Sequence, residues 1–399
     1  MYCTRKLTEQ VWWVGGSDRR LALFENLFPI TRGVSYNSYL ILDEQTAVVD
    51  TVDSSISRQF LENVLHTLDG RPLDYLVINH MEPDHCASIE TLLLRFPTLK
   101  LVGNAKTFAF MGQFYDFPLD GRTVTVKEGD TLSLGGHTLQ FHMTPMVHWP
   151  EVMMTYESSE KLLFSADAFG SFGATGGNLF NDELNFDRDW LDDPPLLRQY
   201  RGQVRPPGAG RAEEALRTGH CHDLPPPRPH LAQQSGLPSG QVRQVEPLRA
   251  GGAGRCGAVR LHVRRHRERC QPSGCGSGGG VKNIAMHDIS STHVSTLISE
   301  VFRCSHLVLA APTYNNGVYP AMATFLHDMK ALGLQNRTVA LVENGSWAPV
   351  SGKLMREMLG ELKGFQVLEP VVSLKSALKD SSLEPLFQLR DRILDSLNG

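Results

Sequence analysis

Hydrophobic and polar positions alternate along two separate stretches of the chain, in patterns that predict two mixed α/β regions. In the first, residues 36–189, apolar runs of strand length are separated by amphipathic segments of helix length at 55–68 and 87–95. The predicted strands are SYLIL (38–42), TAVVDTV (46–52), YLVIN (75–79), LKLVG (99–103), HTLQFHM (137–143) and KLLFSA (161–166). We therefore expect a layered α/β domain here.

The second stretch, from Val281 to the end, has a more regular pattern. Four apolar runs read as buried strands, and each is followed by an amphipathic segment long enough for a helix. These runs are VKNIAMHD (281–288), HLVLAAPTY (306–314), RTVALVEN (337–344) and FQVLEPVV (365–372). Strands that alternate with helices predict a doubly wound parallel sheet.

The segment between the two stretches, residues 201–280, has a different composition. It contains 13 Arg but no Lys, with 15 Gly and 9 Pro, and it lacks Ile, Phe, Tyr, Trp, Met and Asn. One interpretation is a long disordered linker, because such a segment cannot bury enough apolar surface to offset its chain entropy. Solvation alone does not explain the exclusion of Lys, since both cations solvate a linker well. The bias resembles GC-rich DNA translated in the wrong frame.

A shifted reading frame gives text that is typical of folded protein. If each codon takes the last two bases of one residue and the first base of the next, HCHDLPPPRPHLA from His220 admits Ile-Ala-Thr-Ile-Cys-Pro-Leu-His-Gly-Pro-Ile-Trp. VRRHRERCQP from Val263 admits Tyr-Gly-Asp-Thr-Glu-Asn-Ala-Ala-Asn, a loop followed by helix-like text. The hypothesis is a frameshift that enters near Tyr200 and leaves near Gly280. The predicted divisions are domain 1–200, a frameshifted or disordered segment 201–280, and domain 281–399.

Length, charge and cysteine content limit the class of protein. A chain of 399 residues with 41% hydrophobic content can bury two cores of ordinary size. A formal charge of -4 without long blocks of like charge gives no reason to expect nucleic acid or a membrane as the main partner. No apolar run approaches the roughly 20 residues of a membrane span, and no signal-peptide pattern is present, so we expect a cytoplasmic protein. The 7 irregularly spaced cysteines predict reduced thiols.

Four ionisable residues follow a predicted buried strand within INHMEPDHC (78–86). In an extended loop, alternation places His80, Glu82 and Asp84 on one side, and His85 can turn in at the following bend. A polar surface turn is the alternative for any one of these residues, but four together after a buried strand favour a metal site. Without a thiolate, the donor set suits iron, zinc or manganese. Cys86 is more simply a small buried residue of the following helix.

Two further residues stand where such a site needs them. His148, in PMVHWPEVMMTYE, lies between predicted strands, and Asp167, in KLLFSADAFG, ends an apolar run in a turn. With the loop they supply six ligands, more than one tetrahedral zinc uses and suited to two ions bridged by a carboxylate. His137 and His142 are competing candidates, although His142 falls within a predicted strand and is expected to be structural.

Two loops in the second region lie where open α/β sheets bind ligands. APTYNNGVYP (311–320) follows a predicted strand and opens a helix, which places its polar groups at the carboxyl edge of the sheet. ENGSWAP (343–349) ends the next predicted strand. A plain strand-to-helix connection with Asn-Asn-Gly turn chemistry is the alternative for the first loop.

HxExDH with a later HWP and SADAFG resembles the flavodiiron proteins. The resemblance covers about residues 20–200 and 281–399. It implies a metallo-β-lactamase-like αββα sandwich followed by a flavodoxin-like doubly wound parallel sheet. It also implies two irons rather than zinc, since Glu82 stands where metallo-β-lactamase hydrolases usually have His. The implied ligands are His80, Glu82 and His148 for one iron, Asp84 and His85 for the other, and Asp167 as the bridge.

The same resemblance implies FMN as a second cofactor. In the family, loops similar to the two above lie against the isoalloxazine. The implied FMN contacts are Thr313, Tyr314, Asn315, Asn316 and Gly317 in the first loop, and Gly345, Ser346 and Trp347 in the second. The family's phosphate loop and its seventh metal ligand, a His in a CPLHGPIWR-like segment, are absent from the written chain. Both occur only in the shifted frame, so His220, His222 and His230 are not counted as ligands.

The implied activity is that of an oxidoreductase. FMN would take electrons from a small redox protein such as a rubredoxin, or from a reduced cofactor, and pass them to the diiron pair, which reduces O2 to water or NO to N2O. A head-to-tail homodimer is expected, because in the family it brings the flavin of one subunit beside the irons of the other. The alternatives are a dizinc hydrolase with an appended flavodoxin-like module, and a non-catalytic remnant if the frameshift is real.

Overall fold

The structure is a computed structural model that describes residues 2–30, 32–168, 173, 174, 179, 243–245, 259–263 and 284–398. The chain divides into two compact units. The first comprises Met1–Gly112 and Phe117–Gly254, and the second comprises Gln113–Asp116 and Arg255–Gly399. None of the described helices combines the length and the apolarity that crossing a membrane requires.

The first unit contains two main β-sheets, one of seven strands and one of five. In spatial order, the first consists of β1 (Arg5–Lys6), β2 (Val11–Trp13), β7 (Tyr39–Leu42), β8 (Thr46–Val49), β9 (Tyr75–Val77), β10 (Lys100–Gly103) and β11 (Thr123–Thr125). The second consists of β12 (Thr131–Ser133), β13 (Thr138–Met143), β14 (Met153–Glu157), β15 (Leu162–Phe164) and β16 (Arg243–Val245). Two small ribbons pair β3 (Gly16–Asp18) with β6 (Val34–Tyr36) and β4 (Leu23–Phe24) with β5 (Phe28–Pro29).

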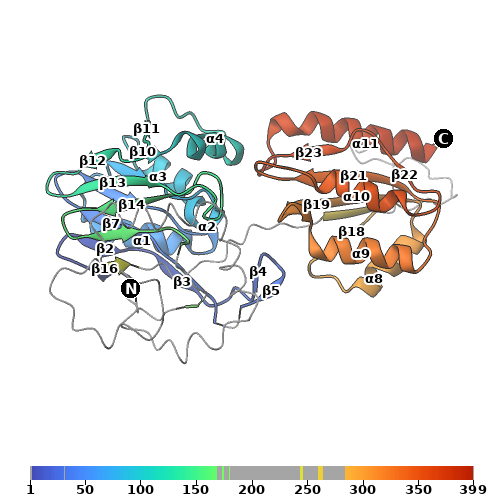
Figure 1. The fold of residues 1–399 in the computed structure, drawn as a ribbon, viewed down its shortest axis with the longest axis horizontal. Helices are drawn as coiled ribbons and strands as arrows, with labels where there is room; N and C mark the ends of the chain where they lie inside the picture. Colours follow the sequence, from blue (N-terminus) through green and yellow to red (C-terminus); the bar gives the residue numbers. More distant parts are fainter. Residues whose placement is uncertain are drawn as a thin grey trace, which may run out of the picture. The chain divides into compact units, whose positions relative to one another are not determined.

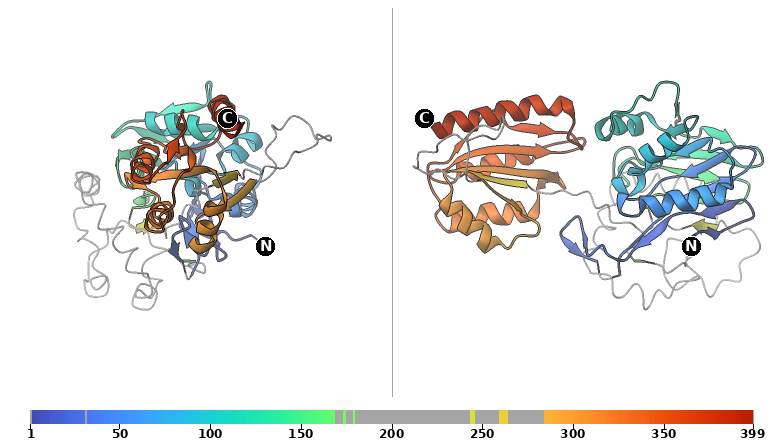
Figure 2. Two further views of the ribbon diagram at one scale, coloured as in Figure 1. Left: turned by 90° about the vertical axis from the view of Figure 1, so that its right-hand side faces the viewer. Right: turned by 180° about the vertical axis from the view of Figure 1, so that it is seen from behind.

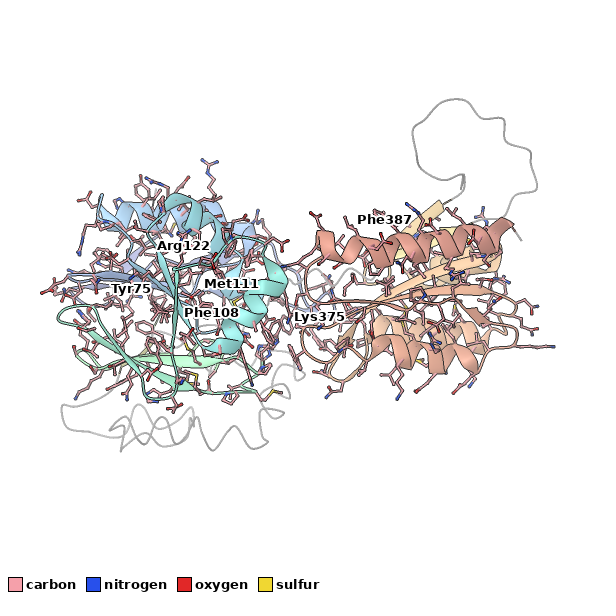
Figure 3. All side chains as sticks on the ribbon, turned by 90° about the horizontal axis from the view of Figure 1, so that it is seen from above. Tyr75, Phe108, Met111, Arg122, Lys375 and Phe387 are labelled. Carbon is pink, nitrogen blue, oxygen red and sulfur yellow. The ribbon has the colours of Figure 1, made fainter. Side chains whose placement is uncertain are left out.

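The two main sheets pack face to face around one apolar core (Figure 1). Val49 and Val77 of the first sheet belong to the same buried cluster as Phe141 and Phe164 of the second. Helix α1 lies along the first sheet (Figure 2), and α4 contributes the buried Met111 (Figure 3). The helical segments are η1 (Ser54–Ile56), α1 (Ser57–Leu68), α2 (Pro83–Cys86), α3 (Ile89–Arg95) and α4 (Ala105–Phe114). The strands therefore build the layered α/β domain that the apolar pattern predicts, in the form of the sandwich that the resemblance implies.

The strands and helices predicted for this region are confirmed to within a few residues. All six predicted strands occur, as β7, β8, β9, β10, β13 and β15, and the predicted helices occur as α1 and α3. Strands β8, β9 and β10 run parallel, so their carboxyl ends lie at one edge of the first sheet. Asp50 follows β8, His80 follows β9, and Asn104 follows β10. This edge positions the candidate site.

The second unit is built on one sheet with a main path of five strands and two further strands beside it. In spatial order the path is β18 (Ile284–Asp288), β17 (Val259–Val263), β19 (His306–Tyr314), β21 (Thr338–Asn344) and β22 (Gln366–Val367). β20 (Gly317–Val318) pairs with β19, and β23 (Val372–Leu374) pairs with β21. The helices are α8 (Val294–Arg303), α9 (Pro320–Ala331), α10 (Ser351–Gly360), η3 (Asp380–Ser382) and α11 (Leu383–Asn398).

Helices cover both faces of this sheet, as a doubly wound fold requires (Figures 1 and 2). On one face, α8 contacts α9 and α9 contacts α10. On the other, α11 buries Leu389 against Ala340 and Val372, while its Phe387 stays exposed (Figure 3). The strand β19 has the bounds predicted for HLVLAAPTY.

The sheet departs from the predicted parallel pattern at β17. β19 pairs in parallel with β21, but β17 pairs antiparallel with both of its neighbours, β18 and β19. Val263, the last residue of β17, pairs with Ile284 and His306, which begin β18 and β19. β17 therefore ends at the edge opposite the loops that follow β19 and β21. It comes from the Arg-, Gly- and Pro-rich segment that the sequence sets apart.

Two smaller predictions for this region are wrong. VKNIAMHD is not a buried strand, because β18 lies at the sheet edge and leaves Met286 66% exposed. FQVLEPVV forms two short strands, β22 and β23, rather than one. Pro370 lies between them and has no N–H to donate to a continuous ladder.

Candidate metal centre

The loop after β9 is held between the two sheets of the first unit by Asn79. Its backbone N–H donates to Asp50 Oδ1 at 2.7 Å, and its side-chain oxygen accepts from Thr155 Oγ1 at 2.7 Å. Its backbone carbonyl accepts from Met153 N at 3.0 Å. Asp50 follows the first sheet and Thr155 belongs to the second, so the start of the loop is fixed by both layers. Asp50 and Ala166 have positive φ values of 55° and 49°, conformations that are uncommon outside glycine and often occur at functional sites.

The loop is extended only as far as Glu82. Pro83 begins the short helix α2, where proline is tolerated because its missing N–H has no helical partner. Asp84 and His85 therefore project from a helical turn rather than from a continuous extended loop. The predicted placement of Asp84 beside His80 and Glu82 is wrong for this reason.

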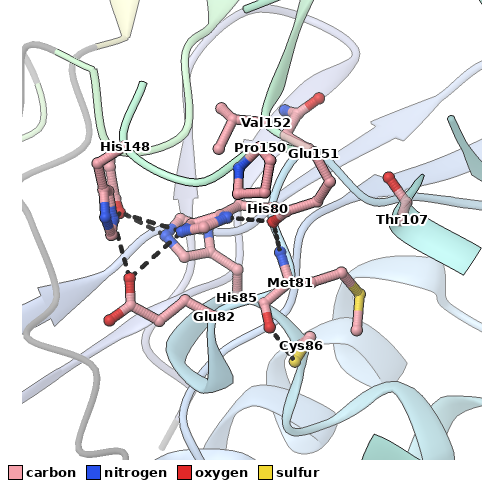
Figure 4. A network of polar contacts seen from close by, with 12 residues as sticks. His80, Met81, Glu82, His85, Cys86, Thr107, His148, Pro150, Glu151 and Val152 are labelled. Carbon is pink, nitrogen blue, oxygen red and sulfur yellow. Dashed lines mark hydrogen bonds and ion pairs between the residues drawn. The ribbon is translucent and has the colours of Figure 1, made fainter. Parts of the chain in front are cut away.

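The first ligand group contains His80, Glu82, His148 and Asp167, whose ligand atoms all lie within 4.8 Å of one another. Glu82 Oε2 is 3.2 Å from His80 Nε2 and 3.0 Å from His148 Nε2. Asp167 Oδ2 is 2.9 Å from His148 Nε2 and 3.5 Å from His80 Nε2. Figure 4 shows the rings of His80 and His148 turned toward the Glu82 carboxylate. Two imidazoles and two carboxylates thus converge on one small volume.

The second group contains Asp84, His85 and Asp167. His85 Nε2 is 3.0 Å from Asp167 Oδ1 and 3.6 Å from Asp84 Oδ2. Asp167 is therefore shared, with Oδ2 facing the first group and Oδ1 facing the second. The structure brings together all six metal-ligand candidates identified from the sequence.

Without a bound cation, the charges of the buried carboxylates in this cluster are compensated only by protons. Burial alone would lower the pKa of His80, but the charge and hydrogen bond of Glu151, with help from Glu82, raise it to about 10. Burial opposes ionisation of Glu82, yet the neighbouring imidazoles of His148 and His80 hold its pKa well below the usual range. Burial, together with the nearby carboxylates, raises the pKa of Asp84. A bound cation would compensate the carboxylates in place of these protons.

Sequence reasoning missed two carboxylates that stand behind the imidazoles. Glu151 Oε1 lies 2.7 Å from His80 Nδ1 and accepts from the backbone N–H of Met81 at 2.9 Å (Figure 4). Asp50 Oδ2 lies 3.5 Å from His85 Nδ1. The available signals were weak: Asp50 ends an apolar strand at the same sheet edge, and Glu151 follows His148 within HWPE.

The competing histidines of the first region lie in neither group. His142 is buried in β13, with Nδ1 3.1 Å from Glu128 Oε1, so its predicted structural role is supported. His137 pairs with Asp43, at 2.9 Å between Nδ1 and Oδ2. Cys86 is buried, as predicted, and its thiol donates to Met81 O at 3.3 Å. His220, His222 and His230 lie outside the described residues.

The predicted flavin loops of the second unit follow neighbouring parallel strands. Pro312 of β19 pairs with Asn344 of β21, so both loops leave the same edge of the sheet. Asn315 and Asn316 have positive φ values of 47° and 60° in the tight turn between β19 and β20. Trp347 is 46% exposed.

Hydrogen bonds hold these two loops in place. Thr313 Oγ1 accepts from the backbone N–H groups of Val350 and Ser351 at 2.8 and 3.1 Å, which ties the first loop to the start of α10. The hydroxyl of Ser346 lies 2.9 Å from that of Ser376. Thr313 Oγ1 thus helps to hold the structure of the second unit. The other candidates, Tyr314, Gly317 and Gly345, lie along the same two loops.

The fold is that of a metallo-β-lactamase-like unit followed by a flavodoxin-like unit, and the first unit carries both candidate ligand groups. Residues 34–190, which include all six ligand candidates, match the family model described as "ODP family beta lactamase". The chain is 28% identical over 365 residues to an anaerobic nitric oxide reductase flavorubredoxin of Pectobacterium atrosepticum, covering 86% of this chain and 68% of that relative. It is 26% identical over 402 residues to a nitric oxide reductase of Moorella thermoacetica, covering 97% of each.

A shorter match has a higher identity, and a solved structure extends the likeness in fold. An anaerobic nitric oxide reductase flavorubredoxin of Klebsiella pneumoniae is 40% identical over 177 residues, 44% of this chain and 36% of that relative. The flavodiiron protein of Giardia intestinalis aligns with a TM-score of 0.50 and 18% identity, over 99% of this chain and 98% of that one. Along most of its length the chain is therefore similar to flavorubredoxins and nitric oxide reductases, and in fold to a flavodiiron protein.

Proposed function

We propose that the chain is a flavodiiron oxidoreductase whose first unit reduces NO to N2O, O2 to water, or both. The observation that carries the proposal is the position of Asp167, whose two oxygens face two different ligand groups. A carboxylate in this position can bridge two metal ions. The names of the relatives, nitric oxide reductase and flavorubredoxin, support the choice of redox chemistry.

The residues present fit two irons. Both groups combine imidazole with carboxylate and lack thiolate, a donor set that non-haem iron accepts. Both side-chain oxygens of Asp84 are buried without a hydrogen-bond partner in the described part of the chain, as expected for a carboxylate that serves a cation. The proposed assignment is His80, Glu82 and His148 to one iron, Asp84 and His85 to the other, with Asp167 as the bridge.

The chain's own residues orient and shield this centre. When bound, the irons supply the redox capacity and the open positions at which a gas molecule can bind. Trp149 packs edge-on against His80, with ring centroids 5.2 Å apart, and restricts the motion of the imidazole. His80, Asp84 and His85 are buried, so their charges act in a water-poor volume where they are stronger than in solvent.

FMN fits the described second unit only in part. The loops at 313–317 and 345–347 lie on one sheet edge and offer turn backbone, amides and Trp347 to an isoalloxazine. In doubly wound sheets the phosphate binds at the carboxyl end of the first strand, at this same edge. β17 occupies that place in the sheet but runs in the opposite direction. As written, it brings no phosphate loop to the flavin edge.

We also propose that residues 201–280 are translated out of frame. The reversed β17 supports this, because the segment supplies a strand at the expected place in the sheet without the direction that the fold needs. In the shifted frame the segment regains a His-Gly-Pro ligand motif and a Tyr-Gly-Asp-Thr loop. Sequencing the gene across this segment tests the proposal, and a continuous frame shared by close relatives would refute it.

For the assembly, the corresponding proposal is a cytoplasmic head-to-tail homodimer that is reduced by a small redox protein such as a rubredoxin, or by a reduced cofactor. Mixing subunits provides a test. A chain with His80→Ala and a chain with altered flavin loops should regain activity together if electrons pass between subunits. Activity that never exceeds that of the separate variants would contradict transfer across the dimer.

The reaction itself is tested with the frame-restored chain. After reduction, anaerobic addition of NO should yield N2O, and addition of O2 should lead to oxygen consumption without accumulation of peroxide. Zinc in place of iron, no yellow flavin, and hydrolysis of esters or lactones would instead identify a dizinc hydrolase and overturn the proposed function.

A further inference from the structure

Glu151 is a buried carboxylate directly behind one candidate ligand. It is 1% exposed, and its Oε1 accepts from the backbone N–H of Met81 at 2.9 Å while lying 2.7 Å from His80 Nδ1. An ionised carboxylate only accepts hydrogen bonds, so the ring nitrogen that faces it must carry the proton. The nitrogen that can exchange its proton for a metal ion is then His80 Nε2, which faces Glu82 and Asp167.

The backbone of Glu151 is fixed from the adjacent strand. Asn104, which follows β10, donates through Nδ2 to Glu151 O at 2.6 Å. Its Oδ1 accepts from the N–H groups of Lys106 and Thr107 at 2.9 and 3.1 Å, at the start of α4. The backbone that carries this carboxylate is thus tied to the end of β10 and the start of α4.

In the second group the corresponding contact is longer. The carboxylate nearest to His85 Nδ1 is that of Asp50, at 3.5 Å, and this nitrogen is buried without a hydrogen-bond partner among the described residues. Among the residues that the structure describes, the first group has four ligand residues and the second has three. A carboxylate that accepts from a ligating imidazole fixes its tautomer and raises its basicity.

We propose that Glu151 is a positioning residue that makes the first ligand group the tighter and first-filled metal position. The proposal rests on the metal centre proposed above. Two inequivalent positions follow: a metal ion added in limited amount would occupy the group of His80, Glu82, His148 and Asp167 before that of Asp84 and His85.

Cobalt titration of the metal-free chain tests this inference, with visible absorption and calorimetry as readouts. Glu151→Gln keeps the size of the side chain and an oxygen acceptor but removes the charge. It should weaken the tighter Co²⁺ site about 10- to 100-fold and change its ligand-field spectrum. Unchanged affinity and spectrum would overturn the proposal, because a purely structural role survives in glutamine.

Asp43→Asn is the matched control. Asp43 has the same kind of contacts as Glu151, but away from the ligand groups. Its Oδ2 accepts from the backbone N–H of His137 at 2.6 Å and lies 2.9 Å from His137 Nδ1. It should leave cobalt affinity unchanged; an equal loss in both variants would contradict the proposal. His80→Ala distinguishes a wrong metal centre from a wrong role for Glu151. If His80→Ala has no effect on cobalt binding, the metal centre itself is wrong, whereas an effect of His80→Ala without one of Glu151→Gln refutes only the role of Glu151.

A measurement on the unaltered chain avoids dependence on the folding of Glu151→Gln. In the zinc-loaded protein, ¹⁵N NMR of the imidazoles should show His80 protonated at Nδ1 and metal-bound at Nε2, with the Nδ1 proton protected from exchange. Metal binding through Nδ1, or a rapidly exchanging proton there, would refute the proposed hydrogen bond to Glu151.

Discussion

The ligand edges of the two units can be compared strand by strand. In the first unit, β8, β9 and β10 run parallel and deliver Asp50, His80 and Asn104 to one edge. In the second unit, β19 and β21 deliver the loops at 313–317 and 345–347 in the same way, but β17 beside them runs antiparallel. A site at a sheet edge needs both the right residues and the right strand direction. The edge of the first unit has both. The edge of the second unit lacks the end of one strand, because β17 runs in the opposite direction.

The largest expected effect comes from restoring that strand. Recoding residues 201–280 in the shifted frame should give one tightly bound FMN per chain, because a parallel first strand would bring a phosphate loop to the flavin edge. The chain as written should bind flavin weakly and in less than stoichiometric amount. Flavin absorbance after gel filtration measures the difference. Equal and stoichiometric FMN in both chains would contradict the claim that the reversed β17 weakens FMN binding.

Asp167 provides the next largest effect, in the first unit alone. Asp167→Asn should reduce NO and O2 consumption by the frame-restored chain to background, because an amide is a poor bridge between two cations. Metal content should fall below two ions per chain, while FMN content should stay unchanged. Asp43→Asn is the control for removal of a buried carboxylate. Loss of FMN together with metal would mean that the two edges are not independent.

Metal affinity should rise with pH in the first unit. The pKa of His80 is raised to about 10 in the metal-free protein, so the imidazole holds a proton at neutral pH that a metal must displace. Apparent affinity for Zn²⁺ should therefore increase by up to about tenfold per pH unit for each proton released between pH 6 and 8. Calorimetry in buffers of different ionisation enthalpy counts these protons. Affinity that does not change with pH would contradict the charge balance described for the cluster.

A smaller effect is expected at Asp43, away from both edges. Burial would raise the pKa of Asp43, but hydrogen bonds from the backbone and ring of His137 lower it to about 2. A lowered pKa in the folded state stabilises the protein above the unfolded pKa of about 3.9, and this contribution is lost as pH falls toward the folded value. Asp43→Asn should therefore cost about 1–3 kcal/mol of unfolding free energy at pH 7. Denaturant titrations should show this difference shrinking between pH 4 and the folded pKa; a constant difference would assign the cost to packing.

Much of this organisation could be predicted from the sequence, for identifiable reasons. Buried strands such as β19 have continuous apolar runs, so their positions follow from pattern alone. The six metal-ligand candidates could be found because His80, Glu82, Asp84 and His85 are crowded into one short stretch. The local shape of that stretch could not, because Pro83 starts a helical turn that alternation does not reveal.

Tertiary contacts account for what sequence reasoning missed. Glu151 acts on His80 across 71 positions in the chain, and nothing in HWPE distinguishes a buried acid from an exposed one. The direction of β17 is likewise set by its neighbours in the sheet and not by its own five residues. The reading frame hypothesis stays a prediction, and it did not include the reversed direction of β17.

The bridged diiron centre is tested most directly by the metal content of the first unit. The frame-restored chain, produced with iron and zinc both available, should contain two irons, and a single limiting equivalent of iron should occupy the position of His80, Glu82 and His148. Mössbauer spectroscopy of the ⁵⁷Fe-loaded protein distinguishes the two positions and their coupling. Two coupled, inequivalent irons are the predicted result. Zinc in both positions, or a single uncoupled iron, would contradict the account of a bridged diiron centre.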